Sequence, residues 1–388
     1  MTPVLTAAAL AICLAAVPTA RTDSDDLDTD DLDTDRLQTA LDDLAALGDQ
    51  SIVVEVRGGD ETWAEAVGPR SLEAGAADAE ADDRIRIGSV TKSMTAAVLV
   101  QLDGEGVIDL DDPLSAYLPD LLPYAEEPTI REIMQHKAGL PEFLFHLYGS
   151  LVTEGDMTDV YANYRTYFSP EELVALGVQD PILFEPGEGW SYSNTGYTAL
   201  GILIEEVTGN RLGTELRERV FEPAGLGDTY LANPGGSGIR GPHLTPYLTT
   251  GDPGRPFFDT TRLSNSQLWA GGGVVSTMGD LNDFYDALLD GTILTADQLA
   301  EATAFQETGR SFGYGLGLFA VAPCPDGSGQ VYTGHDGDSL GHETQSFHSL
   351  DGERQVSVAW NVVDRHGYTD PDEWDAAVDA LIAAALCG

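Results

Sequence analysis

Lysine is rare in this chain, and one of its two lysines stands where it could act as a base. Lys92 and Lys137 are the only lysines among 19 positively charged residues. Lys92 follows Ser89 by three residues at the start of a predicted helix, so the two side chains share one helical face. A desolvated lysine can lose its proton, whereas a guanidinium cannot. The pattern predicts a serine nucleophile with an adjacent amine and helix-terminal N–H groups. The alternative is a capping serine beside a surface lysine.

A second polar group, Tyr192-Ser193-Asn194, stands just before a predicted helix over 195–207. A buried tyrosine beside an ammonium can shuttle a proton, and the Asn194 side chain can hold a substrate amide. The alternative is a loop whose asparagine caps the following helix. The segment 161–163 repeats the same Tyr-x-Asn pattern, so the pattern alone is weak evidence.

A third group, His335-Asp336-Gly337, falls on a late predicted strand. The glycine would let a substrate approach the strand backbone closely. The chain has seven histidines, and a structural role for His335 is the alternative.

Taken in order, the three groups resemble the motifs of the serine β-lactamase and DD-peptidase superfamily. The nearest likeness is its class C-like branch, which contains secreted D-alanyl-D-alanine carboxypeptidases, and it covers about residues 35–388. Further segments resemble the same branch: 136–141 (His-Lys-Ala-Gly-Leu-Pro), 271–277 (Gly-Gly-Gly-Val-Val-Ser-Thr), 313–318 (Gly-Tyr-Gly-Leu-Gly-Leu) and Cys387-Gly388. The resemblance implies an α+β fold, in which a five-stranded antiparallel sheet flanked by helices meets an inserted helical lobe at the active-site cleft.

The same resemblance implies a role for each matching residue. Ser89 would be the nucleophile, Lys92 its base, and Tyr192 the acid that protonates the leaving group. His335 would hold a place that is often lysine. The oxyanion hole would be formed by the backbone N–H groups of Ser89 and Asp338, and substrate would be bound by Asn194, Asp336, Gly337, Asp338 and Trp269. No cofactor or metal is expected, because neither a His-Glu-x-x-His segment nor paired Cys-x-x-Cys segments occur.

Asp336 departs from this pattern, because carboxypeptidases of the branch usually have a small hydroxyl residue there. They can also carry an arginine where this chain has Phe319. A carboxylate in the cleft would repel a substrate carboxylate. The leading prediction is a carboxypeptidase-like serine peptidase. The alternatives are an esterase or amidase for an uncharged or cationic substrate, a β-lactamase, and a penicillin-binding sensor that turns over slowly.

The charge of the chain excludes some partners. With 65 acidic and 19 basic residues among 388, the formal net charge is −46. Such a chain is not expected to bind nucleic acid or an anionic membrane surface. Strong self-repulsion at low salt favours a protein adapted to salty surroundings. The alternative is an acidic surface that only aids solubility. The expected partner is a small peptide-like, ester or β-lactam substrate, and the protein is expected to be a monomer.

Three regions are predicted along the chain. Residues 1–20 resemble a secretory signal peptide, although positive charge is missing from their start, and 21–35 read as a disordered acidic tether. The catalytic domain spans 36–388, with a sheet lobe over about 36–104 plus 271–388 and a helical lobe over about 105–270. No apolar run of 18 residues follows the first segment, so no membrane span is expected there. A secreted or extracytoplasmic location follows from the signal.

The cysteines support the same location. Cys13 would leave with the signal peptide, and Cys324 and Cys387 would remain as an even pair. In an oxidising compartment such a pair favours a disulfide. The alternative is two buried thiols.

Periodicity predicts the elements that must position the three groups. Helices are expected from Leu37, from Ser89, over 129–135 and after Asp370-Pro371. Strands are expected over 51–57, 63–67, 84–87, 312–321, 331–333, 343–350 and 355–362. Strands at both ends with a helical middle indicate one antiparallel sheet built from both ends of the chain.

Overall fold

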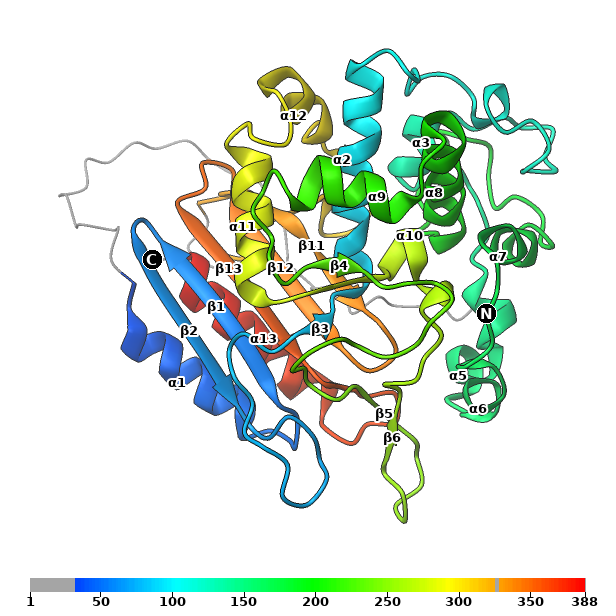
Figure 1. Cartoon of the computed structure of the whole chain (residues 1–388). Helices are drawn as coiled ribbons and strands as arrows, with labels where there is room; N and C mark the ends of the chain where they lie inside the picture. The colour runs from blue at the N-terminus through cyan, green and yellow to red at the C-terminus, as the bar shows by residue number, and fades with distance from the viewer. Residues whose placement is uncertain (1–31, 325–327, 388) are drawn as a thin grey trace.

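The structure, a computed structural model, describes residues 32–324 and 328–387. Its main element is an antiparallel eight-stranded sheet in the order β2-β1-β13-β12-β11-β10-β9-β8 (Figure 1). The strands are β1 (Ile52–Gly58), β2 (Glu61–Val67), β8 (Gln306–Glu307), β9 (Gly313–Tyr314), β10 (Phe319–Val321), β11 (Tyr332–Asp338), β12 (Glu343–Ser349) and β13 (Arg354–Trp360). The predicted α+β fold and the sheet shared by both ends of the chain are confirmed.

The sheet is wider than the five strands expected. Five strands have seven residues each, namely β1, β2, β11, β12 and β13, and the three strands beyond β11 are short. The strand predicted over 312–321 is interrupted, since Gly317 has a φ of 70° in a turn between β9 and β10. This turn divides one predicted strand into two and adds to the number of strands.

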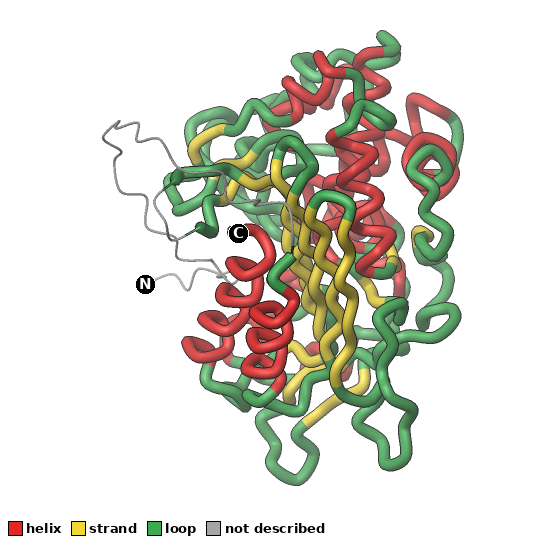
Figure 2. Tube along the Cα trace, turned by 90° about the vertical axis from the view of Figure 1, so that its left-hand side faces the viewer, coloured by secondary structure: helices red, strands yellow, loops and turns green. Residues whose placement is uncertain are grey.

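Two helices cover one face of the sheet. Figure 2 shows helix α1 (Thr34–Ala45) and helix α13 (Pro371–Leu386) side by side against the strands. Leu37, Leu41 and Leu44 of α1 are buried at helical spacing and form a core with the inward side chains of the sheet. The Asp370 carboxylate caps α13, as the sequence predicted.

The start of α1 corrects the expected acidic tether. The Asp33 side chain accepts a hydrogen bond from the Arg36 N–H, 3.0 Å away, and caps the helix. Residues 33–35 are therefore part of the folded domain, because an aspartate before the first turn serves as a helix cap. Leu32 is also buried, whereas residues 21–31 of the expected tether, the expected signal peptide and Cys13 lie outside the described residues.

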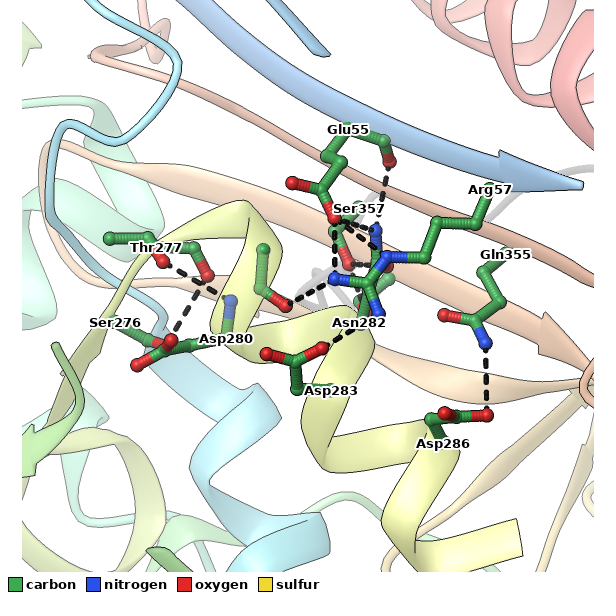
Figure 3. A network of polar contacts seen from close by, with 12 residues as sticks. Glu55, Arg57, Ser276, Thr277, Asp280, Asn282, Asp283, Asp286, Gln355 and Ser357 are labelled. Atoms are coloured by element: carbon green, nitrogen blue, oxygen red, sulfur yellow. Dashed lines mark hydrogen bonds and ion pairs between the residues drawn. The ribbon is translucent and has the colours of Figure 1, made fainter. Parts of the chain in front are cut away.

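Helix α11 (Met278–Leu289) covers the other face and is tied to the sheet by polar contacts (Figure 3). Asn282 is buried, donates to the Glu55 side chain of β1 at 3.2 Å and accepts from the Ser357 hydroxyl of β13 at 2.7 Å. Arg57 contacts both Glu55 and Asp283. These contacts join α11 to two strands that come from opposite ends of the chain.

Helix α2 (Thr91–Gly104) lies in the middle of the molecule (Figure 1). Eleven of its 14 residues are buried, so the helix is enclosed on nearly all sides. It contacts α8 (Asn194–Thr208), α9 (Leu212–Leu216), α10 (Trp269–Gly272) and α12 (Ala296–Ala302). The predicted helices after Ser89, over 129–135 and over 195–207 are confirmed as α2, α3 and α8.

The remaining helices, turns and strands are short. The helices are α3 (Ile130–Met134), α4 (Leu144–Leu147), α5 (Gly149–Glu154), α6 (Thr158–Asn163) and α7 (Pro170–Gly177), with single turns η1 (Gly88–Val90), η2 (Leu114–Ala116), η3 (Arg217–Phe221) and η4 (Asn265–Gln267). Two three-stranded sheets complete the fold: β3 (Ile85–Arg86), β7 (Val274–Ser276) and β4 (Tyr230–Leu231), and β14 (Val362–Val363), β5 (Tyr247–Thr249) and β6 (Phe257–Asp259).

The predicted pairing of Cys324 and Cys387 is present as a disulfide. It links the segment after β10 to the residue after α13, across a sequence separation of 63 residues. Among the described residues, the helices are all too short or too polar to cross a membrane.

Candidate active site

Ser89 lies in the short turn η1, which leads directly into α2. Two glycines let β11 pack against this turn. A Cβ on Gly88 would lie 2.6 Å from the backbone nitrogen of Asp338, and one on Gly337 would lie 2.0 Å from the Ile87 carbonyl oxygen. Gly88 also has a φ of 52°, which favours glycine. The packing brings the backbone nitrogens of Ser89 and Asp338 into one small region, as an oxyanion hole requires.

The backbone of the turn η1 lies close to Gly337 in the structure. The sequence predicted a glycine that lets substrate reach the strand. In the structure its near neighbours are the Ile87 carbonyl oxygen and, at 3.1 Å from a built Cβ, the Ser89 nitrogen. Gly337 is therefore required because the turn η1, which carries Ser89, occupies the space that a side chain would fill.

The Lys92 amine contacts the Ser89 hydroxyl and two other oxygens. Its Nζ atom lies 2.9 Å from Ser89 Oγ, 2.7 Å from Asn194 Oδ1 and 2.8 Å from the carbonyl oxygen of Gly271. The latter two oxygens can only accept hydrogen bonds. A neutral amine has two N–H groups and one lone pair. When both N–H groups are donated to Asn194 and Gly271, the lone pair faces the Ser89 hydroxyl.

Lys92 is fully buried, and burial lowers its pKa to about 7. Two carboxylates, Glu142 and Asp336, act in the opposite direction. A lysine with a pKa near neutrality has a large neutral fraction at pH 7, which a general base needs. The prediction that a lysine is held here as a desolvated amine agrees with this burial.

Tyr192 precedes α8 in a loop, as predicted, and its ring lies beside the amine. The Lys92 Nζ atom is 4.8 Å from the ring centroid. The Tyr192 hydroxyl is buried and makes no hydrogen bond of ordinary geometry within residues 32–324 and 328–387. Burial raises the pKa of Tyr192 well above its usual value, the Asp336 carboxylate raises it further, and the Ser89 hydroxyl acts against both. Tyr192 is thus a neutral phenol with a proton to give.

His335 lies on β11 next to this group and is fully buried. Its Nδ1 atom is 2.6 Å from the backbone carbonyl of Asp336, which can only accept, so Nδ1 carries the proton. Its Nε2 atom then accepts a hydrogen bond from the Tyr314 hydroxyl at 3.0 Å. Burial lowers the pKa of His335. The ring therefore holds its neighbours in place as a neutral group and lacks the positive charge of a lysine.

Two aspartates follow His335 and have different surroundings. The Asp336 side chain is 34% exposed, with one oxygen 3.3 Å from His335 Nδ1. Its negative charge raises the pKa values of both Lys92 and Tyr192. The Asp338 carboxylate instead forms an ion pair with Arg365.

A family model described as Beta-lactamase matches residues 37–382, which is most of the chain. The chain belongs to the beta-lactamase family. It is a serine hydrolase of the β-lactamase and DD-peptidase superfamily, as the order of its motifs indicated.

The names of several similar proteins describe hydrolysis of amides or esters. A crystal structure of a D-stereospecific amidohydrolase from Streptomyces sp. has a TM-score of 0.78 and 29% identity, covering 92% of this chain and 99% of that one. A D-aminopeptidase from Brucella anthropi is 30% identical over 289 residues, 72% of this chain and 49% of that protein. The esterase EstB from Burkholderia gladioli is 31% identical over 183 residues, 46% of either chain. This chain spans about half the length of these two curated relatives.

Trp269, predicted to bind substrate, begins the short helix α10, which also carries Gly271. It is 4% exposed and belongs to a hydrophobic cluster that also includes residues of α2, α8 and α11. Its ring fills the space beside Gly201 of α8, where a Cβ would lie 2.8 Å from a ring carbon. The absence of a side chain at Gly201 makes room for the indole, and substrate binding by Trp269 stays a prediction.

Several residues of the site had no assigned role in the sequence analysis. Glu142 accepts hydrogen bonds from both the backbone N–H and the side-chain amide of Asn194, at 2.6 and 3.0 Å. His136 lies against Tyr192, with ring centroids 4.1 Å apart, and its Nδ1 accepts the Ser193 N–H at 3.1 Å. His136 and Gly271 belong to segments that resemble the family, and Glu142 directly follows one of them. The acidic residue directly after the segment 136–141 was the signal available in the sequence.

Proposed function

We propose that this protein hydrolyses amides of D-amino acids whose α-amino group is free, through an acyl-enzyme on Ser89. The neutral Lys92 amine takes the Ser89 proton while the serine oxygen attacks the amide carbonyl. The developing oxyanion is bound by the backbone N–H groups of Ser89 and Asp338. Tyr192 gives its proton to the departing amine and regains one from the Lys92 ammonium. Water then releases the amino acid from Ser89.

One observation carries the choice of substrate: the charged side chains that act on the buried Lys92 are two carboxylates, Glu142 and Asp336. Asp336 is also partly exposed. Arg365, a cation beside the proposed oxyanion hole, is already paired with Asp338. Such a site attracts an ammonium group and repels a carboxylate. A substrate with a free amine fits these charges better than a peptide that ends in D-Ala-D-Ala.

The names of two relatives support the same choice. The D-stereospecific amidohydrolase matches over nearly its whole length, and the D-aminopeptidase matches over 72% of this chain. Hydrolysis next to a D-residue is the feature that their names share.

The test compares kcat/KM for D-alanine amide, its N-acetylated form, L-alanine amide and N-acetyl-D-Ala-D-Ala. We expect D-alanine amide to be favoured over the N-acetylated amide by about tenfold or more, which corresponds to about 1.4 kcal/mol. Asp336→Asn should reduce this preference, with both amides compared at the same pH because the Asp336 carboxylate also raises the pKa of Lys92. Ser89→Ala should abolish every activity. A preference for N-acetyl-D-Ala-D-Ala would overturn the proposal in favour of a carboxypeptidase.

An esterase is the second candidate, because the similarity to esterase EstB spans 46% of this chain. A neutral p-nitrophenyl ester tests it in the same assay. An esterase would turn over the ester rapidly and the free-amine amides poorly. Fluorescent penicillin distinguishes two further candidates, since a β-lactamase releases it and a slow penicillin-binding sensor keeps it on Ser89.

We also propose that the protein acts outside the cytoplasm. The Cys324–Cys387 disulfide fits an oxidising compartment, where such bonds persist. Mass spectrometry of protein recovered outside the producing cells should find a chain that begins after residue 20. An intact Met1 on active protein would refute the proposed signal.

A further inference from the structure

Glu142 is a buried carboxylate that makes no direct contact with the proposed nucleophile or base. Glu142 follows the segment 136–141 in the sequence and precedes α4, and it is 8% exposed. It accepts three N–H groups: from the Asn194 backbone at 2.6 Å, from the Asn194 side-chain amide at 3.0 Å and from the Leu144 backbone at 3.0 Å. Burial raises the pKa of Glu142, and the three N–H donors and the Lys92 charge act against burial and favour the ionised form, which only accepts.

The bonds to Glu142 fix which end of the Asn194 amide faces Lys92. Because the Nδ2 atom donates to Glu142, the Oδ1 atom points to the Lys92 amine, 2.7 Å away. The carbonyl of Gly271 takes a second N–H of the amine. The remaining position of the Lys92 amine is then the one that faces Ser89, at 2.9 Å.

The opposite orientation of the Asn194 amide would prevent Lys92 from acting as a base. An Asn194 side chain turned by 180° would present its NH₂ group to Lys92. A neutral amine would then accept from Asn194 with its lone pair and could only donate to Ser89. An amine that donates to the serine hydroxyl cannot take its proton.

We propose that Glu142 is a positioning residue, which holds the Asn194 amide in one orientation and thereby turns the lone pair of Lys92 toward the Ser89 hydroxyl. This inference rests on the proposed roles of Ser89 and Lys92 as nucleophile and base. It assigns to Glu142 a task in the acylation step that differs from binding the substrate.

The charge of Glu142 also affects the pKa of Lys92, which the pH dependence of the reaction can measure. Its carboxylate raises the pKa of Lys92 against the larger effect of burial, and Asp336 acts in the same direction. The other titratable groups around the amine are His136, His335, Tyr192 and Tyr197. The histidines have lowered pKa values and the tyrosines raised ones, so all four are neutral near pH 7. Removing the Glu142 charge therefore makes Lys92 lose its proton at lower pH.

The experiment measures kcat/KM against pH for the amide substrate, together with the rate at which a fluorophosphonate labels the protein. In Glu142→Gln we expect the acid limb of both profiles to move down by about one pH unit, because an opposite charge has been removed. The matched control is Glu215→Gln, a buried carboxylate that bonds Asn210 and Arg219 instead. Glu215→Gln should leave the pH of the acid limb unchanged. An unmoved limb in folded Glu142→Gln would overturn the inference.

A double-mutant cycle tests whether Glu142 acts through Asn194. We expect Glu142→Ala to lower kcat at least tenfold, as part of the contribution of a general base, and to have little further effect in an Asn194→Ala background. Equal losses in both backgrounds would contradict a positioning role. Persistent labelling of Ser89→Ala would instead show that the proposed nucleophile is wrong, so failure of the two proposals can be told apart. Thermal unfolding of each variant shows which have folded.

Discussion

The Lys92 Nζ atom lies 2.9 Å from the Ser89 Oγ atom, with its other two hydrogen bonds directed to oxygens that can only accept. This arrangement leaves Ser89 as the one partner that can give a proton to the amine. The chemistry of the site therefore depends on whether Lys92 is neutral.

Lys92→Arg tests this dependence directly. Arginine keeps the positive charge but cannot supply a neutral amine at ordinary pH, so we expect kcat/KM to fall by about 10²- to 10⁴-fold. Thermal unfolding should show that the variant folds. Near-normal rates would mean that Lys92 acts only through its charge.

The pH dependence of the unmodified protein follows from the same amine. Its pKa is lowered to about 7, and the proposed mechanism requires the neutral form. We therefore expect kcat/KM to rise with pH through an acid limb near 7, and to be nearly lost at pH 5. His136 and His335 have lowered pKa values and should remain neutral through this limb. A profile that is flat from pH 5 to 8 would contradict a lysine base.

The substitution Gly337→Ala should push the turn η1, which carries Ser89, away from strand β11. A Cβ at this position would lie 2.0 Å from the Ile87 carbonyl oxygen, so either the turn or the strand must move. We expect a loss of about 1–3 kcal/mol in unfolding free energy, as for other overpacked sites, and a large loss of kcat. Gly227→Ala is the control, since nothing lies within 4 Å of its built Cβ. Similar effects of both changes would argue against the close packing.

The disulfide should contribute to stability mainly by restricting the unfolded chain. For a separation of 63 residues, the chain-entropy model gives about 4 kcal/mol. Urea unfolding of a Cys324→Ser/Cys387→Ser variant should show this loss, and a reducing agent should lower the stability of the unmodified protein to the same level. If reduction changes nothing, the bond is absent in solution.

The net charge of −46 predicts a strong dependence on salt. Repulsion between surface carboxylates is screened as the Debye length falls from about 8 Å at physiological ionic strength to about 3 Å at 1 M. Unfolding temperature and activity should therefore increase between 0.1 and about 1 M NaCl. Better stability at low salt would refute adaptation to salty surroundings.

Much of the site could be predicted from the sequence because its signals are local. Ser89 and Lys92 are three residues apart on one helical turn, and this spacing alone places their side chains together. The helix after Tyr192 and the strand that carries His335 follow from short-range periodicity. The family resemblance rests on the same short segments in order.

Only the tertiary structure decided how these segments meet. The Gly271 carbonyl reaches Lys92 from 179 residues away in the sequence, and Glu142 reaches Asn194 from 52 residues away. The Trp269 ring packs in the core beside Gly201, which has no side chain to occupy that space. Contacts of this kind depend on how whole elements pack, and packing is set by side chains that are distant in the sequence. The sequence therefore determined which groups could react, whereas the folded chain determined which way the amine of Lys92 faces.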